Sequence, residues 1–454
     1  MAMKKIKTTH YATKGRALAA ISLTAALLIC LPGCGNKGWQ ASPVPSSPTQ
    51  PSDETILPTK STVVNSTTVR PTRPIIRLTP TTPATITDML VAVPDALAAT
   101  SFVSYIDFVA WCEIQGIKLG KYTDTNGYLI EDGENIYIND MLFNTSGEYS
   151  NIPHGTAPFI SGMGPASPYF LNSPVRISNT GYGPLQVEQS IIAESYPGEN
   201  KLIKYEAING NFDLTAINQA TDKYFNPYSL PKISEHDNID IYSWDGEMRL
   251  ERRFSPPIFD NLGQGRTLAI QPHDIFGSTL IDYVYEMVGA SRDRTESLAD
   301  NPTYQVIADN LDKLEAMSAI ISSTGLSYSK YLESIGVLGS TPDPDAVELF
   351  ENTDKDAPLM ETYTAFASGI GKDEEGLFVI LILIYEDAET AKGNIETLKN
   401  RLAACRNYED KPYTEEIDSS EVWSEGTALC ATLRGNVITY WNRFIWTEPL
   451  LISN

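Results

Sequence analysis

The sequence predicts an α+β fold of two lobes with antiparallel sheets, and the C-terminal part carries the clearest evidence. The run LFVILILIY at 377–385 is apolar throughout, as is typical of a strand covered on both faces. Asp387 follows and can begin a helix whose apolar positions include Ala391, Leu398 and Leu402. Strand-like runs then occur at 417–423 and 427–433. This β-α-β-β order is half of a ferredoxin-like sandwich, so we expect a C-terminal ferredoxin-like α+β lobe over residues 341–454.

The preceding part, residues 87–340, has the same β-α-β rhythm and is predicted to form the first α+β domain. Alternation over residues 101–107 indicates a strand, and Asn126-Gly127 and Asp132-Gly133 are typical of hairpin turns. Residues 141–186 are rich in Gly, Pro, Ser and Asn and predict a long irregular loop.

Regular elements return after residue 201. The patterns predict strands at 202–208, 239–244 and 267–271, a helix capped by Asp213, a helix from about Ser278 that buries Leu280, Val284 and Met287, and a helix begun by Asn301-Pro302.

The N-terminus has the three parts of a secretory signal. Five bases and no acid precede an uncharged run from Ala17 to Leu31, which is too short to span a bilayer. Leu31-Pro32-Gly33-Cys34 then resembles the lipobox of bacterial lipoproteins, although Pro32 is an uncommon residue there. The resemblance implies cleavage after residue 33, a diacylglyceryl group on the Cys34 thiol, and a further acyl chain such as palmitate on its amino group. Two or more chains anchor a protein stably, so we expect a protein lipid-anchored to the cell membrane on its extracytoplasmic face.

Residues 34–86 are predicted to be a disordered linker. Between 41 and 86, Pro, Thr and Ser supply 26 of 46 residues and no aromatic residue occurs. Such a segment buries too little surface to offset its chain entropy.

Charge excludes one class of partner. The chain has 34 Lys and Arg against 57 Asp and Glu, a net charge of -23. Because the signal and the linker are basic, residues 87–454 hold 24 bases against 55 acids. Phosphates would be repelled, so we expect no nucleic acid as partner.

Several segments occur in a recognisable order: YGPLQVEQSI (182–191), INGNFDLTAINQAT (208–221), IDIYSWDG (239–246), FDNLGQGRTLAI (259–270) and SLADNPTYQVIADNL (297–311). The chain thereby resembles a loosely defined family of uncharacterised bacterial surface lipoproteins that share a GxFD turn and a SLADNPxY helix start. The resemblance covers residues 90–330 most strongly. It implies a fold, and no reaction or catalytic residue.

Catalytic motifs are absent from the sequence. It contains neither HExxH nor GxSxG, and the run at 368–373 lacks both the first Gly and the Ser or Thr of a phosphate loop. The pairs His236-Asp237 and His273-Asp274 suit turns and helix caps, with convergence into a metal or acid–base site as the alternative. We therefore predict no catalytic residues, no metal ligands and no cofactor.

Acidic clusters at Asp124, at Asp343, Asp345, Asp354 and Asp356, and at 373–375 are interpreted as solvated surface charge, with weak Ca²⁺ binding as the alternative. Among the cysteines of the folded part, Cys405 at the end of a helix and Cys430 in a strand are the best candidates for a disulfide, although three buried free thiols are the favoured alternative.

The sequence thus predicts a non-catalytic binding or structural module at the cell surface, attached to the membrane through Cys34, with a protein or an envelope polymer as partner. The alternatives are a secreted, glycosidase-like hydrolase that uses two carboxylates, and a cation-dependent adhesin.

Overall fold

The computed structural model describes residues 84–95, 101–114, 116–117, 181–182, 186–195, 203–224, 231–244, 266–323, 358–406 and 411–437. All of them belong to the second of two units into which the chain divides, Pro74–Asn454. The predicted signal, Cys34, the linker up to residue 83, the hairpins near 121–139 and most of the 141–186 loop lie outside the described residues.

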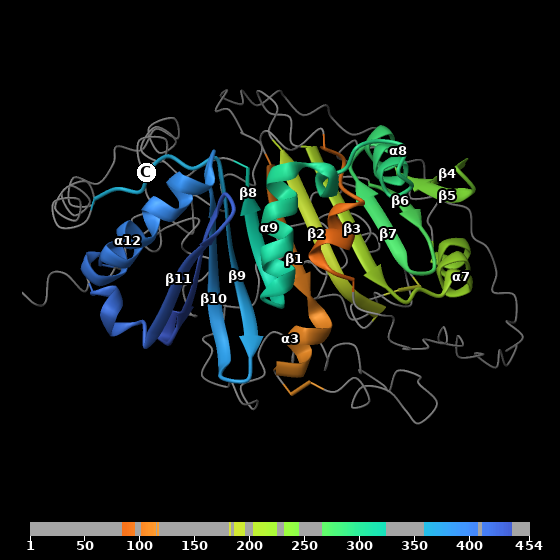
Figure 1. The fold of residues 1–454 in the computed structure, drawn as a ribbon. Helices are drawn as coiled ribbons and strands as arrows, with labels where there is room; N and C mark the ends of the chain where they lie inside the picture. Colours follow the sequence, from red (N-terminus) through yellow and green to blue (C-terminus); the bar gives the residue numbers. More distant parts are fainter. Residues whose placement is uncertain are drawn as a thin grey trace, which may run out of the picture. The chain divides into compact units, whose positions relative to one another are not determined.

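One antiparallel sheet joins the described strands in the order β11-β12-β10-β9-β8-β1-β2-β3-β7-β6-β5-β4 (Figure 1). The strands are β1 (Ser101–Asp107), β2 (Val187–Ser195), β3 (Ile203–Gly210), β4 (Lys232–His236), β5 (Ile239–Ser243), β6 (Thr267–Ile270), β7 (Asp274–Ser278), β8 (Ala316–Ser322), β9 (Ala365–Asp373), β10 (Gly376–Ile384), β11 (Ser419–Glu425) and β12 (Ala428–Arg434).

Helices cover both faces of this sheet. They are α2 (Ile86–Leu90), α3 (Phe108–Ile114), α7 (Leu214–Tyr224), α8 (Ile281–Ala290), α9 (Pro302–Lys313) and α12 (Ala388–Ala404), with short 3-10 turns at Leu298–Asp300 and Tyr413–Glu415. One core cluster packs α2, α8 and α9 against the sheet, and we call that side the first face. A second cluster packs α12 against β8 to β12 on the other side, the second face. Helix α9 crosses the first face in front of β8 (Figure 1).

Strand β10 explains why the sequence is apolar without alternation. Ile380 and Ile382 belong to the cluster on the first face, whereas Val379 and Leu381 belong to that on the second face. A central strand that is covered on both sides buries consecutive residues. The prediction for this strand is confirmed.

The helix starts were also predicted from the correct residues. Asn301 caps α9 by accepting the Thr303 N–H at 3.1 Å, and Pro302 occupies the first turn. Asp387 caps α12 by accepting the Thr390 N–H at 2.8 Å. Asp213 likewise accepts the Thr215 N–H at 2.8 Å at the start of α7. Each cap satisfies a backbone donor that the first helical turn leaves without a partner.

Other elements differ from the predictions. The predicted linker extended to residue 86, yet Thr85 caps α2 and Ile86 is buried in the core. The helix predicted from Ser278 begins at Ile281, because residues 274–278 form β7. His273 therefore precedes a strand, of which Asp274 is the first residue, and not a helix. Leu280 is exposed rather than buried, while Val284 and Met287 are buried as predicted.

The α+β class is confirmed, but the two ferredoxin-like lobes are not. Strands β8 and β9 lie on either side of the predicted domain boundary and pair directly, from Ala316–Gly371 to Ser322–Phe366. The two predicted lobes therefore share one continuous sheet. In the N-terminal half, the two predicted strands correspond to β3 and β5, which are separated in the sheet by β7 and β6, so the β-α-β rhythm there does not place its two strands next to each other.

Two glycines of β9 allow this pairing to be close. A Cβ on Gly371 would lie 2.7 Å from the Leu314 carbonyl oxygen and 2.7 Å from the Phe378 ring, and one on Gly369 would lie 2.6 Å from the Ser318 carbonyl oxygen. The turn that follows α9 thus packs directly against β9.

Among the described helices, none is both long and apolar enough to cross a membrane.

Candidate functional site

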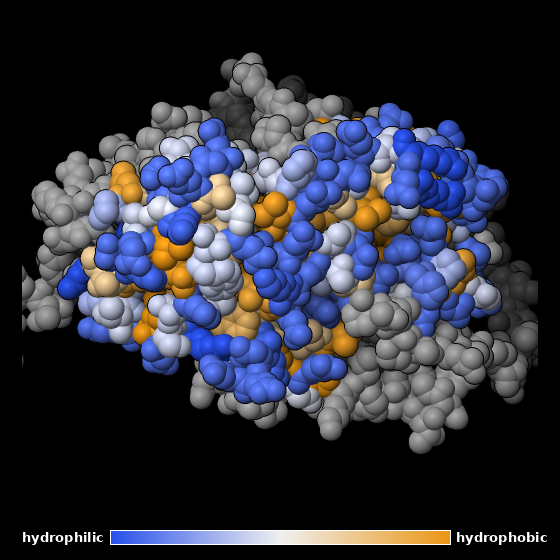
Figure 2. Space-filling view, viewed as in Figure 1, coloured by the Kyte–Doolittle hydropathy of each residue, from blue (hydrophilic) through white to orange (hydrophobic). Residues whose placement is uncertain are grey.

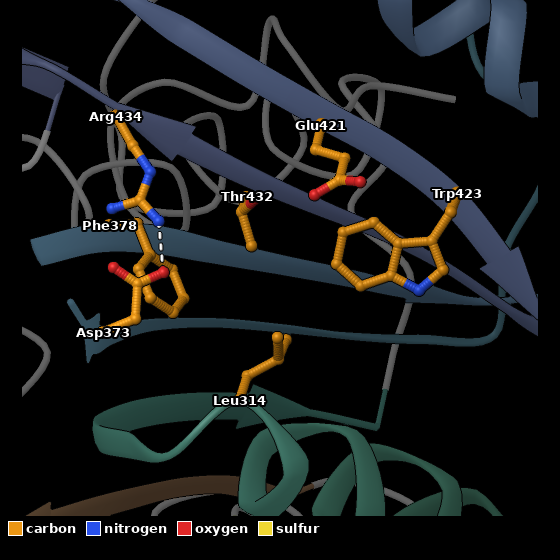
Figure 3. A pocket seen from close by; sticks show the side chains of 7 residues that line it. All are labelled: Leu314, Asp373, Phe378, Glu421, Trp423, Thr432 and Arg434. Carbon is orange, nitrogen blue, oxygen red and sulfur yellow. Dashed lines mark hydrogen bonds and ion pairs between the residues drawn. The ribbon is translucent and has the colours of Figure 1, made fainter. Parts of the chain in front are cut away.

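A groove with a volume of about 350 Å³ opens beside the end of α9, over strands β10, β12 and β11 (Figure 3). Its lining consists of Leu314, Asp373, Phe378, Glu421, Trp423, Thr432 and Arg434. Leu314 comes from the turn after α9 and faces the strands from the opposite side of the groove. The remaining side chains belong to four neighbouring strands of the sheet.

Strand alternation brings these side chains to one face. In β12, Leu429, Ala431 and Leu433 pack into the cluster beneath α12, so Thr432 and Arg434 point to the first face. In β11, Glu421 lies directly opposite Thr432, and Trp423 lies opposite Cys430, which belongs to the cluster on the first face. Glu421 and Trp423 are two positions apart and therefore extend from the same side of β11 (Figure 3).

Arg434 is held by several groups at one end of the groove. Its guanidinium forms an ion pair with Asp373, lies 3.5 Å from a Glu375 carboxylate oxygen, and donates a 3.4 Å hydrogen bond to the Gly376 carbonyl. Its central carbon also lies 4.9 Å from the centroid of the Phe378 ring. The positive charge is thus placed between an aromatic ring and carboxylates, an arrangement in which each contact favours the cation.

The ion pair alters the titration of Asp373. Burial alone would raise the pKa of this carboxyl, but the hydrogen bonds and the charge of Arg434, together with the N–H groups of Glu375 and Gly376, outweigh burial and hold the pKa below its ordinary value. Asp373 is therefore ionised at neutral pH.

The middle of the groove holds an exposed carboxylate and a tryptophan ring in place of an ion pair. Among the described residues, no cation pairs with Glu421, and its side chain is exposed. Trp423 is half-buried and packs against the cluster on the first face. Beyond them, Lys313 of α9 pairs with Glu425 of β11 at 2.6 Å. This hydrogen bond and the charge of Glu425 raise the pKa of Lys313. The pair connects α9 to β11 next to the groove.

The predicted His-Asp pair at 236–237 forms a turn. Asp237 and Asn238 adopt φ values of 54° and 60° between β4 and β5, a conformation that Asn and Asp tolerate in hairpin turns. Arg294 pairs with the Asp237 carboxylate, and Arg292 donates to its carbonyl at 2.6 Å. His236 stacks on Tyr285 with the ring centroids 4.1 Å apart. These contacts agree with the predicted turn role of this pair.

The second pair lies at the start of β7. His273 contacts the Gly210 carbonyl through Nδ1 at 3.3 Å, and Asp274 accepts a 3.4 Å hydrogen bond from Asn209. Burial raises the pKa of Asp274 above its ordinary value.

Within the described part of the chain, no group of three or more His, Cys, Asp or Glu side chains is arranged to hold a metal ion.

Two buried ion pairs on β3 were not predicted. Lys204 pairs with Glu194 at 2.8 Å, and Glu206 pairs with Arg266. Lys204, Glu206 and Arg266 are each no more than 4% exposed. Charged residues are almost never this buried unless they are paired. In the sequence these residues are scattered charges in or near apolar runs, and no spacing connects them.

Cys405 and Cys430 are not brought together. Cys405 ends α12 in the cluster on the second face, whereas Cys430 belongs to the cluster on the first face and its thiol lies 3.5 Å from Asn310 Oδ1. All three described cysteines are buried, and none forms a disulfide. Because the sheet lies between Cys405 and Cys430, the candidate disulfide is not formed in this structure.

Cys34 and the acidic positions 124, 343, 345, 354 and 356 lie outside the described residues.

Among the highlighted residues that the structure describes, only Asp373 of the 373–375 cluster lines the groove. Glu375 and Asp373 surround Arg434 there. Arg434, Phe378, Glu421 and Trp423 were not singled out, because they come from separate strands and no motif joins them.

Comparison with known proteins identifies no relative by sequence, since neither a protein-family model nor a curated protein matches the chain. Among solved structures, crystal form I of TP0453 matches with 9% identity and a TM-score of 0.31, covering 79% of this chain and 98% of that chain. Crystal form III of the same protein matches with 9% identity and a TM-score of 0.33, covering 78% and 96% of the two chains.

Proposed function

We propose that this chain is a lipid-anchored extracytoplasmic protein whose folded part is a non-catalytic binding module at the cell surface. The anchor rests on the signal-like N-terminus and Cys34, and the linker that follows would separate the folded part from the membrane. The observation that carries the binding role is the groove over β10, β12 and β11, where charged, aromatic and hydroxyl side chains share one accessible face of the sheet.

Three properties of this groove favour recognition. Its side chains come from strands of a continuous sheet, so their relative positions are fixed before a ligand arrives. The ion pair between Arg434 and Asp373 holds one end rigidly. Trp423 supplies aromatic area at a small cost in conformational entropy, as aromatic residues do in many binding surfaces.

The geometry favours binding over the hydrolase alternative at this groove. A glycosidase-like pair needs one carboxyl with a raised pKa to act as general acid. Asp373 has a lowered pKa, and its oxygens are engaged by Arg434 and by the backbone of residues 375 and 376. A carboxylate held in this state stays ionised at neutral pH and does not deliver a proton.

We further propose that the C-terminal part retains half of a ferredoxin-like unit. Strand β10, helix α12, strand β11 and strand β12 follow one another along the chain, and β12 lies between β10 and β11 in the sheet. That is the arrangement of a split β-α-β unit. Part of the face of this unit opposite α12 forms the floor of the groove.

Photo-crosslinking in intact cells tests the binding role. A photoreactive amino acid replaces Thr432 in the groove of the full chain, and a matched chain carries it in place of Lys399 on α12. We expect a discrete crosslinked species from position 432 and none from position 399. Equal labelling from both positions, or none from position 432, would contradict the proposal.

A further inference from the structure

We propose that the groove binds a positively charged group between the carboxylate of Glu421 and the ring of Trp423, namely a lysine or arginine side chain of a basic partner peptide. This inference rests on the binding role proposed above and names the chemistry of the ligand.

The groove itself contains one complete example of such an arrangement. Arg434 is a cation that lies over the ring of Phe378 and is paired with the carboxylate of Asp373. Glu421 and Trp423 repeat the other two components, a carboxylate and an aromatic ring, on the neighbouring strand (Figure 3). Among the described residues, no cation completes this second set.

The distribution of charge leads to the same ligand. Asp373 compensates Arg434, and Glu425 compensates Lys313 at the side of the groove. The carboxylate of Glu421 therefore remains as the uncompensated charge of the lining. An incoming ammonium or guanidinium group would neutralise it, whereas an anion would be repelled by it.

The shape of the site suits a side chain with an aliphatic stem. Leu314 faces the strands across the groove, so it can contact methylene groups while the charged end reaches Glu421. Trp is the aromatic residue whose ring attracts cations most strongly. Packing of Trp423 against the core cluster fixes the ring in place.

A polypeptide is favoured as the source of the cation by the charge and by the edge position of β11. Residues 87–454 carry 24 bases against 55 acids, and such an excess draws basic partners toward the surface. Strand β11 ends the order of described strands, so the groove lies beside an edge of the described sheet. The face seen in Figure 2 is mainly hydrophilic with small hydrophobic patches.

Calorimetric titration of the full chain with an amide-capped pentalysine peptide tests this inference. Glu421→Gln and Trp423→Leu should each weaken the affinity by about threefold or more, the size expected when one exposed charge or cation–π contact is lost. The matched control is Glu396→Gln, because Glu396 is an exposed acid on α12 at the other side of the sheet and its loss changes the net charge equally. We expect less than about a twofold effect from this control.

The other outcomes each overturn the inference. Equal losses from Glu421→Gln and Glu396→Gln would mean that pentalysine responds only to the general negative charge. Binding of a neutral oligosaccharide that depends on Trp423 but not on Glu421 would assign the groove to a sugar. Absence of pentalysine binding would exclude a basic ligand, while the crosslinking from position 432 would still decide the binding role separately. Because Glu421 is exposed, its variant keeps the test valid even if Trp423→Leu fails to fold.

Discussion

The guanidinium of Arg434 lies over the ring of Phe378, with 4.9 Å between its central carbon and the ring centroid, while the same group pairs with Asp373. These contacts join β12 to β10 and to the end of β9. Arg434 therefore holds together the three strands that form one end of the groove, β9, β10 and β12.

We expect Arg434→Met to lower the free energy of unfolding by about 1 kcal/mol at pH 7, since the variant loses a half-exposed ion pair and a cation–π contact. The folded-state pKa of Asp373 is lowered, so the stabilisation is present above the unfolded pKa of about 3.9 and disappears as pH falls through the folded value. Urea unfolding of the wild type and of Arg434→Met at pH 7 and near pH 3 measures the loss of free energy of unfolding at each pH. If this loss is the same at both pH values, the ion pair contributes nothing to stability. Lys399→Met on α12 provides a surface control.

The coverage of β10 on both faces can be tested with two neighbouring residues. Ile380→Ala and Leu381→Ala should each lower the free energy of unfolding by about 2–5 kcal/mol, because each side chain is at most 1% exposed and each leaves a cavity in a different cluster. Ile233→Ala, at a position 56% exposed, should cost less than about 1 kcal/mol. A small effect at either position 380 or position 381 would mean that one face of the strand is open to solvent.

The cysteines should behave as buried thiols. Burial is the main cause that raises the pKa of Cys430 to about 12, so the reactive thiolate is scarce at pH 8. We expect iodoacetamide to leave Cys112, Cys405 and Cys430 unmodified in the native chain and to alkylate all three in denaturant without a reducing agent. Peptide mapping by mass spectrometry gives the result. Alkylation of Cys405 and Cys430 only after reduction would instead reveal the candidate disulfide between them.

The proposed lipid anchor makes a separate prediction about Cys34. We expect intact mass measurement of the chain from bacterial membranes to show cleavage before Cys34 and the added mass of acyl chains. Cys34→Ala should abolish this mass and move the protein out of the membrane fraction. Cys30→Ala is a matched control that leaves the lipid in place, since Cys30 belongs to the predicted signal. A Cys34→Ala chain that remains lipidated contradicts the anchor.

The sequence predicted those elements whose signals are local. The caps of α9 and α12 were recognisable because Asn301 and Asp387 supply the oxygen that the first turn needs. Strand β10 was recognisable because its apolar run is long and without gaps. Each of these signals lies within about ten residues and needs no knowledge of the neighbours in space.

Strand β9 was missed because its sequence is shaped by contacts with distant residues. Its run AFASGIGKD is poor in large apolar residues, since the turn after α9 and the backbone of β8 occupy the space beside Gly371 and Gly369. Strand β8, AMSAIIS, lacks alternation because all seven residues are buried. The groove was missed for a related reason, because its residues become neighbours only when β12 pairs with both β10 and β11.

The position of β1 affects how the chain reaches its final structure. This strand is hydrogen-bonded to β2 on one side and to β8 on the other, and a Ser318 side chain donates to the Tyr105 carbonyl from 213 residues along the chain. During synthesis, one edge of β1 therefore stays unpaired until residues 316–322 have emerged. Pairing across such sequence distances is slow to form, so we expect the sheet to be completed late in folding.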